Sequence, residues 1–189
     1  EGERAVGQAA EAFNTLFGIS SLATVGIEEI GETIGAPKVF QLYYHKDKAL
    51  TWEMIDRCKE AKFDALALTV DTIVGGNRER DLWTGFTSPP RLTPASLLSF
   101  ATNPSWTLNY LLREPFALSN LQNHIAEGSN VSISVSDYFS TMLDQSMDWD
   151  AAAAVRERWG KAFCLKGIMS VEDARKAVEI GADAIMVSN

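Results

Sequence analysis

The stretch FCLKGIMSVEDARKAVEIGADAIMVSN, residues 163–189, contains two short apolar runs separated by one helical pattern. The first run, FCL, predicts a buried strand that ends at Lys166. Ser170 and Asp173 have the spacing of a capping box, so we expect a helix to begin there and to stop at Gly181. The second run, AIMV, predicts another strand. Two strands joined by one helix lie parallel, so this stretch predicts a parallel sheet covered by helices.

The same alternation of strand and helix occurs towards the N-terminus. The runs TLFGISS, KVFQLYY and DALALTVD predict three more strands. Helical patterns cover residues 3–13, 26–35, 49–62 and 149–159. The strand ends Ser20, Tyr43 and Thr69 are 23 and 26 residues apart, and Lys166 and Ser188 are 22 apart. Each interval is long enough for one strand–helix unit, which predicts an α/β fold.

One interval is much longer than the others. Thr69 and Lys166 are 97 residues apart, so this interval must hold a long insertion besides one helix. We place the insertion at residues 77–147, which are rich in Ser, Thr, Asn and Pro. Segments of this size after a strand are usually functional. We therefore expect one domain, residues 1–189, that carries an insertion or lid.

Composition excludes several classes of function. The net charge is -8, which disfavours a nucleic-acid partner. Cys58 and Cys164 form neither a metal-binding motif nor a disulfide framework, so a reducing, cytoplasmic compartment is expected. The sequence has no apolar run long enough to span a membrane and no signal-peptide pattern.

Polar side chains follow each predicted strand at its C-terminal end. They are Ser20, Gln41, Tyr43, Thr69, Asp71, Lys166 and Ser188. In parallel sheets and barrels these ends carry the chemistry. Lys166 directly follows an apolar run, where a charge is costly without a partner. A bound anion or an electron-rich cofactor would supply that partner.

The motifs SSLATVGIEEI, FQLYYHKD, LTVDTIVGGNRERD and LKGIMSVEDARKAVEIGADAIMVSN together resemble the FMN-dependent α-hydroxy-acid oxidases and dehydrogenases. Within that family, the sequence resembles the bacterial L-lactate and mandelate dehydrogenases. The resemblance implies a TIM (β/α)8 barrel, here incomplete with about strands 2–6, and an insertion after the fourth family strand. It also implies FMN as the cofactor and oxidation of an L-2-hydroxy acid, such as lactate, to the 2-oxo acid.

The resemblance assigns roles residue by residue. It implies that Gln41 and Thr69 hydrogen-bond the flavin ring, that Ser20 lines the flavin's face and that Lys166 lies beside the flavin's N1 and C2 carbonyl. A fixed cation at that place stabilises the negative charge that reduction creates.

Three further residues match catalytic positions of the family. Tyr43 corresponds to the tyrosine that contacts the substrate, and Arg78 to an arginine near the substrate carboxylate. Asp71 corresponds to the aspartate that orients the catalytic histidine. In the family, that histidine and the main carboxylate-binding arginine follow the VSN motif. His45 and His124 do not match that histidine. We expect His45 at the rim of the barrel and His124 in solvent. We therefore interpret the chain as an internal fragment of the enzyme, inactive on its own.

The insertion resembles that of the respiratory dehydrogenases, which docks at the membrane. The apolar residues that could form a docking face, or alternatively a lid on the barrel, are Trp106, Leu108, Tyr110, Leu111, Leu112 and Phe116. Without a polybasic patch, docking would have to be hydrophobic. We expect a cytoplasmic enzyme with possible peripheral contact with the inner membrane, and a homo-oligomer at full length. The electron acceptor, whether quinone, cytochrome or oxygen, stays open.

Two other interpretations are compatible with the residues. A lysine at the end of a barrel strand can form a Schiff base, so Lys166 could serve a class I aldolase-like lyase. Five strands also suit a non-catalytic α/β binding module of flavodoxin-like order.

Overall fold

Five parallel strands form one sheet. The computed structural model describes residues 2–72, 79–85, 92–112, 118–121 and 141–188. The strands are β1 (Phe17–Ser20), β2 (Lys38–Tyr43), β3 (Ala65–Thr69), β4 (Ala162–Lys166) and β5 (Ala184–Met186). Their order across the sheet is β1-β2-β3-β4-β5, so every strand pairs with the next one in the chain. A flavodoxin-like module would have the order 2-1-3-4-5. The sequential order excludes that interpretation and is the order of a barrel segment.

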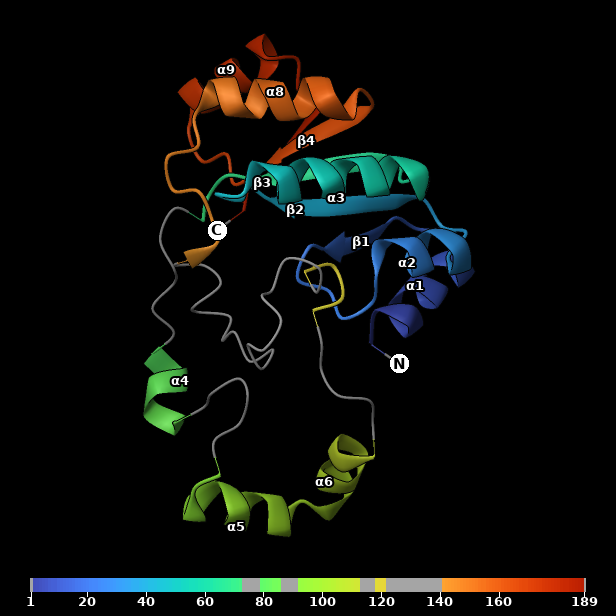
Figure 1. The fold of residues 1–189 in the computed structure, drawn as a ribbon, viewed down its shortest axis with the longest axis vertical. Coiled ribbons are helices and arrows are strands. Elements are labelled where there is room, and N and C mark those ends of the chain that lie inside the picture. The colour runs from blue at the N-terminus through green and yellow to red at the C-terminus, as the bar shows by residue number, and fades with distance from the viewer. Residues whose placement is uncertain (1, 73–78, 86–91, 113–117, 122–140, 189) are drawn as a thin grey trace.

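Helices flank the sheet, and those that follow β1 connect its strands (Figure 1). They are α1 (Gly2–Ala12), α2 (Ile27–Thr33), α3 (Lys48–Glu60), α8 (Trp149–Trp159) and α9 (Val171–Glu179). Between β3 and α8, the expected insertion forms α4 (Glu79–Thr84), α5 (Pro94–Thr102) and α6 (Pro104–Leu111). Figure 1 shows α5 and α6 lying well away from the sheet.

Capping residues set the helix boundaries that the sequence predicts. The Ser170 side chain accepts a hydrogen bond of 3.0 Å from the Asp173 backbone N–H at the start of α9. Helix α8 has the predicted bounds and ends at Gly160, which adopts the left-handed conformation with φ of 69°. Helix α3 ends two residues earlier than predicted because Lys62 takes a positive φ of 57°.

The alternation of side chains along β2 separates the two faces of the sheet. Phe40 and Leu42 are fully buried beneath the helices, whereas Gln41 and Tyr43 are half-buried on the opposite, inner face. The ring of Phe40 meets that of Phe63 edge-on, with 5.9 Å between centroids. Burying each such ring contributes about 1.5–3 kcal/mol. The core therefore fixes β2 and β3 and leaves their inner face available for a site.

A short segment of the insertion is anchored on the helices. Leu118 and Leu121 are buried in the core. The Asn120 side-chain oxygen accepts a hydrogen bond of 3.0 Å from the Ile27 backbone N–H, at the first residue of α2. The guanidinium of Arg57 also donates to that oxygen at 3.4 Å. This contact ties residues 118–121 to α2 and α3.

Candidate active site

Five of the predicted site residues lie on the inner face of the sheet, on adjacent strands. In the register of the sheet, Ser20 pairs with Gln41, and Thr69 pairs with Lys166. Tyr43, at the end of β2, pairs with Thr69. Residues paired in a parallel sheet project from the same face. The structure thus brings these five side chains to one edge of the sheet, the C-terminal edge, as the sequence predicts.

Three of these side chains form a continuous hydrogen-bonded row. The Ser20 hydroxyl donates to the side-chain oxygen of Gln41 at 2.7 Å, and the side-chain amide nitrogen of Gln41 donates to the Thr69 hydroxyl at 2.6 Å. The Leu22 backbone N–H also donates to the Ser20 hydroxyl at 3.2 Å. The row crosses β1, β2 and β3, and it offers both donors and acceptors along one line.

Lys166 has a carboxylate partner within the chain. Its ammonium nitrogen lies 3.5 Å from an Asp71 carboxylate oxygen, and both side chains are partly exposed, at 29% and 21%. The sequence predicts a bound anion or cofactor beside Lys166, and the structure places Asp71 there. The Lys166 carbonyl accepts from the Val70 backbone N–H at 2.8 Å, so the end of β4 is fixed against β3.

The remaining predicted residues have different outcomes. Arg78 and His124 lie outside the described residues. His45, expected at the rim, is instead fully buried, and its backbone N–H donates to the Thr51 hydroxyl at 3.1 Å. The expectation for His45 is wrong because the insertion returns over the loop that carries it: His45 forms an antiparallel bridge with Leu143.

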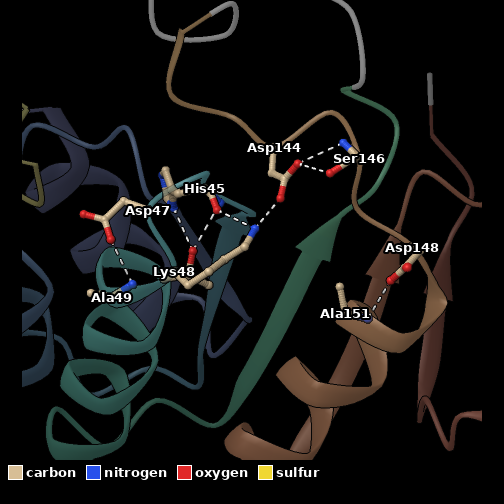
Figure 2. Close-up of polar contacts among 9 residues, drawn as sticks. His45, Asp47, Lys48, Ala49, Asp144, Ser146, Asp148 and Ala151 are labelled. Carbon is tan, nitrogen blue, oxygen red and sulfur yellow. Dashed lines mark hydrogen bonds and ion pairs between the residues drawn. The ribbon is translucent and has the colours of Figure 1, made fainter.

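The contact between His45 and Leu143 also brings two charged residues, Lys48 and Asp144, together, and the sequence does not predict this pair. Figure 2 shows the Lys48 side chain extended between the His45 carbonyl and the Asp144 carboxylate. Lys48 donates to the His45 carbonyl at 2.9 Å and forms an ion pair with Asp144. The Lys48 ammonium holds the pKa of the Asp144 carboxyl at about 2, below its usual range. No local signal identifies this pair, since 96 residues separate its members.

The two thiols are poor nucleophiles. Cys58 is fully buried, and burial raises the pKa of its thiol well above the usual range. Burial also raises the pKa of the Cys164 thiol, on β4. Within the described residues, no cluster of three or more metal-ligating side chains is found. In the same part of the chain, no helix is long and apolar enough to cross a bilayer.

Known proteins resemble this chain along its whole length. L-lactate dehydrogenases from Pseudomonas aeruginosa and Vibrio cholerae are each 35% identical over 192 residues, which cover 100% of this chain. These alignments cover 49% and 50% of the relatives, so the chain spans about half the length of the curated relatives it matches.

Solved structures of related enzymes have the same fold as this chain. The crystal structure of the monotopic membrane protein (S)-mandelate dehydrogenase superimposes with a TM-score of 0.90 at 26% identity, covering 100% of this chain and 49% of that one. A mandelate oxidase variant with (S)-mandelic acid gives a TM-score of 0.68 at 28% identity, covering 100% and 43%. The fold is therefore part of a TIM barrel, as predicted. Residues 1–189 also match the family model described as FMN-dependent dehydrogenase, and the chain belongs to the FMN-dependent dehydrogenase family.

Proposed function

We propose that the protein containing this chain oxidises an L-2-hydroxy acid to the 2-oxo acid with FMN. The observation that carries this proposal is the row Ser20–Gln41–Thr69 with the Lys166–Asp71 pair beside it, at the ends of adjacent barrel strands. The resemblance to L-lactate dehydrogenases at 35% identity supports the choice of substrate class.

The residues present fit a flavin ring. The ring edge offers carbonyl acceptors and an N–H donor. The row supplies two hydroxyls and a side-chain amide, which can donate hydrogen bonds to the carbonyls and accept one from the N–H. Ser20, Gln41 and Thr69 would hold the ring. Lys166 would lie where negative charge develops on reduction. When bound, FMN accepts the two electrons that the hydroxy acid loses.

The chain's own side chains would then act on the substrate. Tyr43 would contact it from the end of β2, next to Thr69. The guanidinium fork of Arg78 suits a carboxylate, which it can bind through two parallel hydrogen bonds. Asp71 would hold the family's histidine base in orientation and stabilise its cationic form once it has taken a proton.

The test is a visible spectrum of the purified protein at its native length. We expect flavin absorbance, and bleaching of that absorbance under anaerobic conditions by L-lactate, L-mandelate or glycolate. D-lactate is the control and should leave the spectrum unchanged. Absence of flavin, or no bleaching by L-lactate, L-mandelate or glycolate, would overturn the proposal. Borohydride trapping of a carbonyl substrate on Lys166 would instead support the Schiff-base alternative.

We further propose that helices α5 and α6 contact a membrane surface. None of their residues is buried. Leu98, Trp106 and Leu111 are 67%, 52% and 68% exposed. The rings of Phe100, Trp106 and Tyr110 stack in one column, with centroids 5.6 and 5.2 Å apart.

The charge of this region suits a hydrophobic mode of contact. From residue 92 to residue 112 the sequence has no Asp, Glu, Lys, Arg or His. Amphipathic surface helices bind through their apolar area and, where they are basic, through anionic lipid. Only the first contribution is available here. The description of the related (S)-mandelate dehydrogenase as a monotopic membrane protein supports the proposal.

Vesicle flotation tests the membrane contact. We expect the protein to bind neutral phosphatidylcholine vesicles, with little change when anionic lipid or salt is added. Trp106→Ser combined with Leu111→Ser should weaken binding, whereas Val178→Ser, an exposed apolar residue on α9, should not. If the double variant lowers enzyme activity and leaves flotation unchanged, α5 and α6 act as a lid instead.

A further inference from the structure

The loop after β2 and the arm that returns from the insertion, residues 141–147, are paired through their backbones. The Lys46 backbone N–H donates to the Met142 carbonyl at 2.9 Å, and the Asp144 backbone N–H donates to the Tyr44 carbonyl at 3.0 Å. Leu143 is buried between these two contacts. The arm is therefore joined to the loop by one antiparallel β-bridge, His45 to Leu143.

One ammonium group fastens this bridge. Lys48 donates to the His45 carbonyl on the loop, pairs with the Asp144 carboxylate on the arm, and lies 3.7 Å from the centroid of the Tyr44 ring (Figure 2). Asp144 in turn accepts from the Ser146 backbone N–H at 2.9 Å and from the Ser146 hydroxyl at 2.6 Å. Both ends of the ion pair are thus oriented by a second contact.

The fastened loop begins directly after Tyr43. The carbonyl and the ring of Tyr44 are both held by the clasp, which we define as Lys48 and Asp144. Beneath the clasp lies a cavity of about 30 Å³. Its lining residues are Tyr44, Thr69, Val70, Thr72, Leu143, Asp144 and Met147. The arm therefore also covers the end of β3, where Thr69 stands beside Tyr43.

We propose that Lys48 and Asp144 are positioning residues for Tyr43. By fastening the arm to the loop, the clasp fixes the direction in which the chain leaves β2 and so the place of the Tyr43 side chain at the strand end. This proposal rests on the proposed function, in which Tyr43 contacts the substrate. Displacing a substrate-positioning group by about 1 Å can cost up to about 100-fold in rate.

The first measurement is amide hydrogen exchange in the protein at native length, with or without bound flavin. In Lys48→Met, peptides that contain the Lys46 and Asp144 amides should exchange faster than in wild type, and in Lys48→Arg they should stay near wild type. Lys176→Met is the matched control. Lys176 also pairs with a carboxylate, Glu172 at 3.3 Å, and lies 6.0 Å from an aromatic ring, that of Trp149. Unchanged exchange in Lys48→Met would show that Lys48 and Asp144 do not fasten the arm to the loop, and would overturn the proposal.

The second measurement separates positioning from stability. Lys48→Met should retain flavin and lose about tenfold in kcat/KM for the 2-hydroxy acid. The loss should appear mainly in KM, because the clasp positions Tyr43, which contacts the substrate. Asp144→Asn should reproduce this loss, and it replaces Lys48→Met if that variant does not fold. Faster exchange with unchanged kinetics would overturn the link to Tyr43. If wild type binds no flavin, the proposed function fails, and the exchange result still decides whether the clasp exists.

Discussion

Gly167 lies directly against Asp71. A Cβ on Gly167 would come within 2.6 Å of both the Cβ and the Cγ of Asp71, closer than real Cβ atoms approach. The glycine also has a φ of 105°, a conformation that other residues rarely adopt. Its backbone N–H donates to the Met186 carbonyl at 2.9 Å, so it cannot move away without breaking a contact with β5. The absent side chain at Gly167 thus leaves the space that the Asp71 carboxylate occupies.

Gly167→Ala should therefore be far more disruptive than a glycine replacement elsewhere. Gly160→Ala is the matched control, because Gly160 also has a positive φ, of 69°, but the nearest atom to an added Cβ is 3.8 Å away. We expect the control to lose about 1–2 kcal/mol in the free energy of unfolding, the cost of the left-handed conformation alone. Gly167→Ala should lose about 1–3 kcal/mol more through overpacking. Equal losses in denaturant titrations of the two variants would contradict the proposed close contact.

Lys166→Met should slow flavin reduction far more than it weakens substrate binding. The ammonium would act on charge that develops during reduction, so its loss is felt in the transition state. Removing one such contact costs on the order of 10²–10³ in rate. Stopped-flow reduction at saturating substrate measures this directly. Lys161→Met is the control, since Lys161 precedes β4 at the opposite end and donates to the Phe63 carbonyl at 3.2 Å. A raised dissociation constant with an unchanged reduction rate would refute the role of Lys166.

The ion pair of Asp144 should add a pH-dependent part to stability. Lys48 and Ser146 lower the folded-state pKa of Asp144 from 3.8 to about 2. The ionised carboxylate therefore stabilises the folded protein fully above about pH 4, and this contribution is lost as pH falls towards 2. The free energy of unfolding of Asp144→Asn should lie up to about 1 kcal/mol below wild type at neutral pH. The two should converge only below about pH 2, and a difference that stays constant with pH would exclude this origin.

Local signals explain why much of the fold could be predicted. Helices α8 and α9 each have a side-chain cap at the first turn and a glycine shortly after the last turn. A few adjacent residues therefore determine where each helix begins and ends. The strands alternate between helix-covered and inner-face positions. Because parallel strands end at one edge, the polar residues Ser20, Gln41 and Thr69 could be expected to meet, and they form a hydrogen-bonded row.

The features that escaped prediction depend on contacts between distant residues. The clasp joins Lys48 to a residue 96 positions away, and nothing near either residue predicts the other. The burial of His45 follows from the same return of the chain. The partner of Lys166 could not be deduced either, because the Asp71 carboxylate reaches it only where Gly167 leaves room.

Asn120 supplies the last prediction, since its side-chain oxygen binds both α2 and α3 and so helps to anchor the insertion to the barrel. That oxygen accepts from the Ile27 backbone N–H at 3.0 Å, and the side chain is almost fully buried. The first N–H groups of a helix have no partner within the helix, so Asn120→Ala leaves this one unsatisfied. An unsatisfied buried donor costs about 1–3 kcal/mol, and we expect a loss of that size in the free energy of unfolding.

Asn120→Asp separates the hydrogen bond from the size of the side chain. Within the described residues, the Asn120 amide nitrogen has no hydrogen-bond partner, so replacing it by oxygen sacrifices no contact seen there. The carboxylate would keep the acceptor for Ile27 and lie 3.4 Å from an Arg57 nitrogen, at the N-terminal end of α2, where negative charge is favourable. Asn120→Asp should therefore unfold at a higher denaturant concentration than Asn120→Ala at pH 7, and this advantage should shrink below pH 4 as the carboxylate is protonated. If both variants lose the same stability at pH 7, the oxygen is not the anchor, and the packing of Leu118 and Leu121 holds the segment instead.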